Sequence, residues 1–181
     1  YQTGADGLGF STAGTLRFSI DSTGLGAFSG SNITVGSLDI GHGANGDDSN
    51  VAVGKDAMDG AQAGALDNTA IGSGALSGTL TSAADYNTAV GSSAGAVITS
   101  GNNNTAIGAL ALDACTGGLE NTAVGSAALS AACGNSNAAV GANALAAYTG
   151  SYATAIGHSA ADAATSAANT TAIGYGALGA L

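Results

Sequence analysis

The chain has 181 residues, including 31 Gly and no Pro or Trp, a length that indicates one domain. Only 8% of its residues are charged, and 12 Asp and Glu against 2 Lys and Arg give a formal net charge of −10. The acidic balance excludes nucleic-acid binding through a basic surface, and no apolar run approaches the ~20 residues that insertion into a membrane needs.

The ends of the sequence suggest a larger parent protein. The first residue is Tyr1 rather than Met, no signal-peptide pattern follows it, and the last residue, Leu181, falls inside a repeat unit. We therefore expect a fragment or processed product of something longer.

Residues 1–33 carry no repeat and predict a β-rich N-terminal module or connector. The segment 16–20 alternates apolar and polar residues, as a half-exposed strand does. The residues 21–24, Asp-Ser-Thr-Gly, are a turn signal, and 25–28 then predict a return strand. The short apolar segments 34–36 and 38–41 are candidates for imperfect first coils of the repeat that follows.

The residues 16–24, Leu-Arg-Phe-Ser-Ile-Asp-Ser-Thr-Gly, resemble a short Arg-x-x-Ile-Asp-x-x-Gly β-module of bacteriophage tail-fibre proteins. In those proteins the module precedes repeats or a C-terminal self-cleaving chaperone. The resemblance implies that the chain is part of a phage fibre.

Residues 34–181 are dominated by an internal repeat, Asn-Thr-Ala-(Ile/Val)-Gly, with clear copies at 68–72, 87–91, 104–108 and 121–125. Eight repeat glycines follow one another at spacings of 16 to 19 residues, and Ala stands three residues after each of them. The predicted structural positions are Ile71, Gly72, Ala75, Leu76, Val90, Gly91, Ile107, Gly108, Val124, Gly125, Val140, Gly141, Ile156, Gly157, Ile173 and Gly174.

The repeat predicts an all-β protein, a parallel β-solenoid of about eight coils that stack at the ~4.8 Å strand spacing. A helical repeat is the alternative, because the chain is rich in Ala. It is disfavoured because each unit joins Gly to a β-branched residue and because the spacings keep no helical phase. The loose segments between Leu and the next Asn contain turn residues and vary in length.

Period-two alternation predicts which residues share a face of each strand. In Thr-Ala-Ile-Gly, Thr and Ile point to one side while Ala and Gly point to the other. We expect Ile/Val and Leu in the core and the flat Ala/Gly face against other copies of the chain. A single stack has a thin core, which predicts a homo-oligomer packed around a common axis.

The run Asn-Thr-Ala-Ile-Gly-Ser-Gly-Ala-Leu at 68–76 and its copies resemble the head repeat of the YadA-like trimeric autotransporter adhesins, and similar repeats occur in phage tail fibres. The resemblance covers about residues 34–181. It implies a left-handed parallel β-roll and a homotrimer. These repeats are longer than the adhesin repeats, and the extra length predicts protruding turns.

Cys115 and Cys133 occupy near-equivalent turn positions on adjacent coils, seven and eight residues after their repeat glycines. The expected stacking distance lies within the ~4.4–6.8 Å Cα range of a disulfide. A disulfide and two free thiols both remain open, and a metal site is disfavoured because no His lies nearby.

Several polar residues are candidates for binding or chemical sites. Tyr86, Tyr148 and Tyr152 lie in or beside variable turns and are candidates for contact with a host-surface glycan or protein, with packing across the turn as the alternative. Tyr175 follows a repeat glycine. The remaining candidates are Asp47 and Asp48 as an incomplete calcium loop, His42 and His158 as exposed spectators, and Asp56 with Asp59 as a carboxylate pair without a pocket.

The repeated Thr forms a further candidate site, because an exposed ladder of Thr on a flat solenoid face can order water as ice-binding proteins do. We expect no such activity, because Thr shares its face with Ile/Val, which are expected in the core. Normal growth of ice beside the protein would close this question.

These patterns predict a structural segment of a homotrimeric extracellular fibre rather than an enzyme, with no cofactor. We expect a bacteriophage tail fibre on the virion, holding a host-binding tip away from the particle. The alternatives are the head of a bacterial adhesin on the cell surface, or a secreted structural filament.

Overall fold

The computed structural model describes residues 8–12, 15–20, 26–28, 32–35, 38–43, 49–166 and 169–179. All regular structure in these residues is β, and none of them forms a helix long and apolar enough to cross a membrane. Three N-terminal strands, β1 (Leu8–Thr12), β2 (Thr15–Ile20) and β3 (Gly26–Phe28), form one antiparallel sheet in that order. The predicted strand at 16–20 and its return strand are therefore confirmed as β2 and β3.

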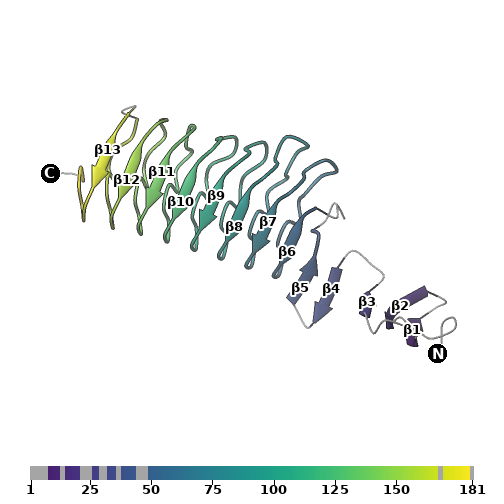
Figure 1. Cartoon of the computed structure of the whole chain (residues 1–181). Helices are drawn as coiled ribbons and strands as arrows, with labels where there is room; N and C mark the ends of the chain where they lie inside the picture. Colours follow the sequence, from purple (N-terminus) through teal and green to yellow (C-terminus); the bar gives the residue numbers. More distant parts are fainter. Residues whose placement is uncertain are drawn as a thin grey trace.

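A second sheet contains ten strands in chain order, and its last eight are parallel (Figure 1). Each repeat contributes one strand of three residues. The strands are β6 (Val51–Val53), β7 (Thr69–Ile71), β8 (Thr88–Val90), β9 (Thr105–Ile107), β10 (Thr122–Val124), β11 (Ala138–Val140), β12 (Thr154–Ile156) and β13 (Thr171–Ile173).

The register of these strands follows the repeat. Thr88 pairs with Thr69 on one side and with Thr105 on the other, and the Ala and Ile/Val positions that follow pair in the same way. Each strand pairs with its copies in the neighbouring coils, so the predicted parallel β-solenoid is confirmed. At the strand spacing of ~4.8 Å, seven steps between eight strands give a stack about 34 Å long.

The solenoid begins later than the sequence suggested. The segments proposed as imperfect first coils form instead an antiparallel hairpin, β4 (Asn32–Val35) with β5 (Leu38–Gly41). β5 also pairs antiparallel with β6, through Ile40 opposite Val53 and Gly41 opposite Ala52. The coil interpretation of these two segments is wrong, because only a few residues separate β4 from β5 and parallel pairing needs a crossover of a dozen or more.

The return wall of each coil forms a second ladder of backbone hydrogen bonds. The Leu76 N–H donates to the Ala94 carbonyl of the next coil at 3.0 Å, and the Leu112 N–H donates to the Ala128 carbonyl at 3.1 Å. The repeated Leu turns into the coil from a left-handed backbone, with φ of 48° at Leu76 and 54° at Leu112. This side chain is completely buried at Leu76, Leu112, Leu129 and Leu145, whereas Leu178 in the last coil is 60% exposed.

The repeat glycine marks the point where the chain leaves the sheet. Gly72 and Gly91 have φ of 131° and 139°, a region that L side chains rarely adopt. A Cβ atom on Gly72 would lie 2.5 Å from the carbonyl oxygen of Gly91 in the next coil. The column of glycines therefore follows from both the turn and the close stacking of coils.

The core is built from alanine and leucine, which corrects the expected assignment of faces. The strand alanines Ala70, Ala89 and Ala123 are 0% exposed, whereas Ile71 and Ile107 are 40% exposed. The interior is narrow because the Leu column of the return wall already fills it, so a methyl group is what fits opposite. The Ala face therefore lies inside the coil and is not the surface that meets another copy.

One irregular coil shows how tightly this interior is filled. Gly95 stands where most coils have Leu, and Ile98 supplies the missing volume from the variable turn, with a side chain that is 1% exposed. A Cβ atom on Gly95 would lie 3.0 Å from both Ile98 Cδ1 and Leu76 Cδ2. The core volume is conserved although the position that provides it changes.

Candidate functional site

The outer face of the parallel sheet carries two columns of side chains, one of Thr, replaced by Val51 in β6 and by Ala138 in β11, and one of Ile or Val. The second column is broadly exposed: Val140 is 38%, Ile107 40% and Ile156 44% exposed. No charged residue occurs in strands β6 to β13. We call these two columns over β7–β13, the strands that Figure 1 shows side by side, the outer sheet face; its side chains are uncharged and carry methyl and hydroxyl groups.

The Thr column lies on this outer face, which overturns the reason for discounting it. Thr69, Thr88, Thr105 and Thr122 are half-buried by their neighbours within the sheet, and Thr171 at its edge is exposed. The side chains of these threonines make no hydrogen bond to any other residue that the structure describes. Their hydroxyl groups are therefore available to a partner or to water.

A buried column of asparagines runs beside the sheet at the corner of each coil. Its members are between 0% and 2% exposed and are Asn50, Asn68, Asn87, Asn104, Asn121 and Asn137. Each Oδ1 accepts the backbone N–H of the residue at this position in the next coil; the Asn121 N–H, for example, donates to Asn104 Oδ1 at 2.9 Å. Each amide nitrogen donates to a turn carbonyl of that next coil, as from Asn104 Nδ2 to Gly118 O at 2.8 Å.

This column explains the orientation of the strands. In Asn-Thr-Ala-Ile the side chains alternate, so an inward Asn requires an inward Ala and an outward Thr and Ile. A buried amide without partners is costly, and the stack satisfies each of these amides through the neighbouring coils. The fixed Asn two residues before Ala was the sequence signal that could have identified the correct face.

His42 lies at the N-terminal end of this column. Within the stack, the Asn carbonyl accepts a strand N–H from the preceding coil, as Asn68 O does from Val51 N at 2.8 Å. Asn50 has no preceding parallel coil, and its carbonyl lies 3.2 Å from His42 Nδ1. A ring N–H at Nδ1 takes the place of the strand N–H, so His42 is not the spectator that the sequence suggested.

Tyr148 lies at the other end of the column and is wrong as a surface-contact candidate. It is 0% exposed, and its hydroxyl donates to the Ser151 carbonyl at 3.1 Å. Ala153 takes the Asn position of the following coil and provides no amide, so the buried phenol contributes volume and a polar group at this corner. Burial raises the pKa of Tyr148, and a hydrogen bond with Thr170 opposes this shift.

The two other tyrosine candidates are exposed. Tyr86 is 60% and Tyr152 is 62% exposed, and both immediately precede the column position, with φ of 59° and 60°. Asn103, Glu120 and Ser136 occupy the same position in the coils between them. The tyrosines therefore project from one corner of the stack, four coils apart, and their contact with a host surface stays a prediction.

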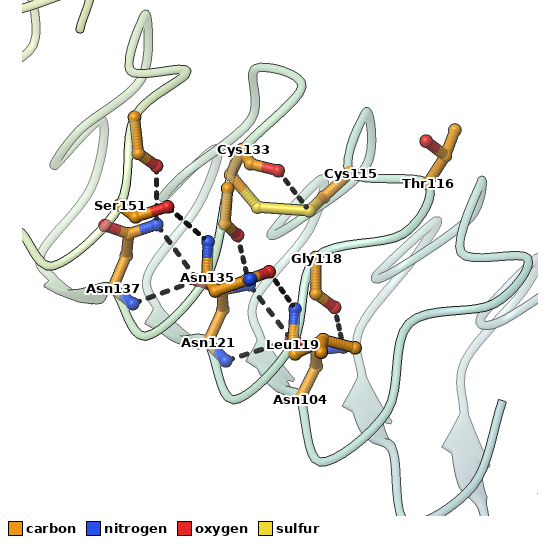
Figure 2. The surroundings of a disulfide bond; sticks show 12 residues. Asn104, Cys115, Thr116, Gly118, Leu119, Asn121, Cys133, Asn135, Asn137 and Ser151 are labelled. Carbon is orange, nitrogen blue, oxygen red and sulfur yellow. Dashed lines mark hydrogen bonds between the residues drawn. A yellow bond between two sulfur atoms is a disulfide. The ribbon is translucent and has the colours of Figure 1, made fainter. Parts of the chain in front are cut away.

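Cys115 and Cys133 form a disulfide between adjacent coils, with their Cα atoms 5.2 Å apart (Figure 2). Cys115 is 1% exposed and Cys133 is half-buried. The bridge joins the variable turns of two adjacent coils. It leaves no free thiol among the described residues.

The remaining candidates do not converge on one site. His158 stacks on Tyr175 of the next coil with ring centroids 5.4 Å apart, and Lys55 Nζ pairs with Asp56 Oδ2 at 2.6 Å on the surface. Asp47 and Asp48 lie outside the described residues. In the part of the chain that the structure covers, no group of three His, Cys, Asp or Glu is arranged to hold a metal ion.

Comparisons with known proteins identify no relative of this chain. No protein-family model, no curated protein and no solved structure matches the chain.

Proposed function

We propose that this chain is a rigid segment of a homotrimeric extracellular fibre, a bacteriophage tail fibre that positions a host-binding tip. The resemblance of residues 16–24 to a tail-fibre module, and of the repeat to trimeric β-roll heads, supports this proposal. The implied coil is left-handed. The work of the segment is mechanical, because continuous backbone ladders resist bending and separation of the coils.

The outer sheet face is the observation that most strongly supports assembly with other copies of the chain. Burial of an Ile or Val side chain is worth about 1.5–3 kcal/mol, and much of that is unrealised while the column is exposed. Contiguous apolar surface on a soluble protein marks an interaction site. The absence of charge on strands β6–β13 suits close contact with an identical face, because stacked coils repeat any charge and like charges repel.

Two further copies of the chain are the partners that we assign to this face. Around a threefold axis each chain presents the same column, so Ile meets Ile or Val along the whole stack and Thr hydroxyls lie beside them. The polar turns then remain outside, where Tyr86 and Tyr152 are available to a host-surface glycan or protein.

Sedimentation equilibrium of the 16.7 kDa chain tests the assembly. We expect a mass of three chains, and we expect the single variant Ile107→Glu to sediment as a folded monomer because the trimer would bury one such charge from each chain at the axis. The matched control is Tyr86→Glu, an equally drastic change at an exposed corner, which should remain trimeric. A folded wild-type monomer at low micromolar concentration would refute the assembly.

The place of the segment in a fibre needs a separate observation. Electron microscopy of the intact parent particle, with gold-labelled antibody against residues 49–166, should place the label along tail fibres. Label on a bacterial cell surface instead would favour the adhesin alternative, and label on neither would favour a secreted filament.

One observation favours a second candidate function. The Thr column is on the outer face, where hydroxyl and methyl groups repeat at the ~4.8 Å strand spacing, an array that can order water. If the chain is monomeric, this face remains open to ice. Shaping of single ice crystals by the wild type but not by Thr105→Lys would support this function, whereas unaltered crystal growth would exclude it.

A further inference from the structure

The variable turns of the stack contribute a second column of buried side chains, separate from the repeated Leu. Its members are the largest buried residues of successive turns: Leu80, Ile98, Cys115 and Tyr148, each between 0% and 1% exposed. The turn between those of Cys115 and Tyr148 covers residues 130–136 and contains no buried residue. This coil therefore contributes no fully buried turn side chain to the core, and its half-buried Cys133 packs against the core in that place.

The first part of the same turn, residues 130–134, also lacks backbone hydrogen bonds to the turn of the preceding coil. Elsewhere, bonds join the variable turns of neighbouring coils: Thr81 N to Thr99 O at 2.7 Å, Thr99 N to Thr116 O at 2.8 Å, and Thr149 N to Thr165 O at 2.7 Å. No backbone hydrogen bond joins residues 113–118 to residues 130–134, all of which the structure describes. The disulfide spans this one interruption (Figure 2).

The contact between the two cysteines indicates what happens without the covalent bond. Cys115 Sγ lies 3.4 Å from the Cys133 carbonyl oxygen. A disulfide sulfur carries no hydrogen, so this approach is a van der Waals contact in the oxidised chain. In the reduced chain the Cys115 thiol is able to donate to that carbonyl, but such a bond is weak.

From these observations we propose that the Cys115–Cys133 bridge is a redox-sensitive lock on the coil at residues 125–141. The bridge replaces both the missing core side chain and the missing ladder bond, so its reduction opens this turn locally while the sheet stays paired. In the reaction a dithiol reductant attacks the half-buried Cys133 sulfur and releases the Cys115 thiolate. Its second thiol then displaces Cys133, so two electrons and two protons reach the protein and the reductant becomes a disulfide.

Hydrogen exchange of the whole chain, followed by mass spectrometry with and without dithiothreitol, tests the lock. We expect the amides of Gly134, Asn135 and Ser136, which donate hydrogen bonds to neighbouring coils, to exchange about tenfold faster or more after reduction, because a loop-closing bond is removed. The amides of β8, at Thr88–Val90 and two coils away from Cys115, should not change. A Cys115→Ser/Cys133→Ser variant should exchange as the reduced chain does, with or without the reductant.

Two results would overturn this proposal. Unchanged exchange at residues 134–136 after complete reduction, verified by alkylation of both thiols, would show that the bridge adds nothing locally. Equal acceleration at residues 134–136 and at β8 would show global unfolding rather than a local lock. Neither result depends on the trimer or on the fibre.

Discussion

At the scale of single residues, the buried asparagine makes the most demanding contacts in each coil. Asn104 Oδ1 accepts from Asn121 N and Nδ2, and its own amide donates to Asn87 Oδ1 and Gly118 O. These partners belong to neighbouring coils, so each amide ties three successive coils together. A hydrogen-bonded network of this kind specifies register more sharply than apolar contacts do.

Replacement of this amide should be costly. Asn104→Ala leaves Gly118 O and Asn121 N without their partners inside the stack, and at about 1–3 kcal/mol for each of the two buried groups we expect a loss of roughly 2–6 kcal/mol. Urea unfolding measures it. The matched control is Asn102→Ala, two residues away, whose side chain accepts only from exposed Asn103 and should change stability by less than about 0.5 kcal/mol. Equal effects of the two variants would contradict the role of the column.

A second residue, Asp113, should make the stability of the folded chain depend on pH. Its Oδ1 is buried without a hydrogen-bond partner in the described structure, and desolvation raises the pKa of this carboxyl above its ordinary value. The folded chain therefore binds this proton more tightly than the unfolded chain, and stability falls as pH rises from the ordinary Asp value through the raised one.

The variant Asp113→Asn removes that charge. We expect a higher melting temperature than the wild type at pH 7, where the wild-type carboxylate is ionised, and a difference that shrinks toward about pH 3, where the wild-type group is neutral in both states. Thermal melts followed by circular dichroism across this range give the comparison. A melting temperature that drops at pH 7 would show that the carboxylate is stabilised by its surroundings.

At the scale of the coil, the glycine that ends each strand fixes both the turn and the spacing. Gly91 has φ of 139°, and a Cβ atom there would lie 2.6 Å from the carbonyl of Gly108. Two residues after the repeat glycine, by contrast, the backbone is left-handed but open. Gly74 shares that position with Ser93 and Ala127, which have φ of 54° and 53°.

This difference predicts that the same substitution, Gly to Ala, costs more stability at Gly91 than at Gly74. Gly91→Ala should destabilise the chain by about 2 kcal/mol or more, because both the backbone angle and the next coil resist a methyl group. Gly74→Ala should cost only the left-handed backbone angle, about 1–2 kcal/mol, because the nearest atom to its Cβ lies at an ordinary 3.5 Å. Denaturation midpoints of the two variants decide the matter, and a Gly91 variant as stable as the Gly74 variant would contradict close stacking at the glycine column.

The repeat predicted the coils better than it predicted their faces. The Gly and the Ala that recur in all eight copies predict parallel stacking whichever way the side chains point. Strands β6–β13 therefore followed directly from the repeat. Alternation alone does not say which side is inside, and apolarity favoured Ile over Ala. The inner face is decided by the width of the interior and by the hydrogen-bond partners of the Asn amide. Both depend on the return wall and on the neighbouring coils rather than on one strand.

Other contacts depended on neighbours that no local pattern reveals. His42 lies near the Asn50 carbonyl because β5 enters the sheet antiparallel, and Tyr148 is buried at a corner where the following coil has Ala153. The equivalent turn positions of Cys115 and Cys133 fixed their proximity but left their oxidation state open. Such compensations between coils are visible only once the stack is assembled.

At the scale of the whole molecule, the stack is a one-dimensional array in which each coil contacts only its neighbours. Its interior is filled mainly by alanine and leucine, and the uncharged outer sheet face is exposed in the single chain. We propose that this face lies at the axis of three chains while the return wall faces solvent. Packed sheets lie about 10 Å apart, so residues on the outer face of different chains should be close neighbours.

Interchain distances from single spin labels test this claim most directly, since each chain then carries one label and every measured distance joins two chains. The labels are attached to Thr105→Cys on the outer sheet face and, separately, to Ser77→Cys on the return wall, in the chain with its native disulfide intact. We predict clearly shorter distances at position 105 than at position 77. The opposite order, or no dipolar coupling at position 105, would contradict it.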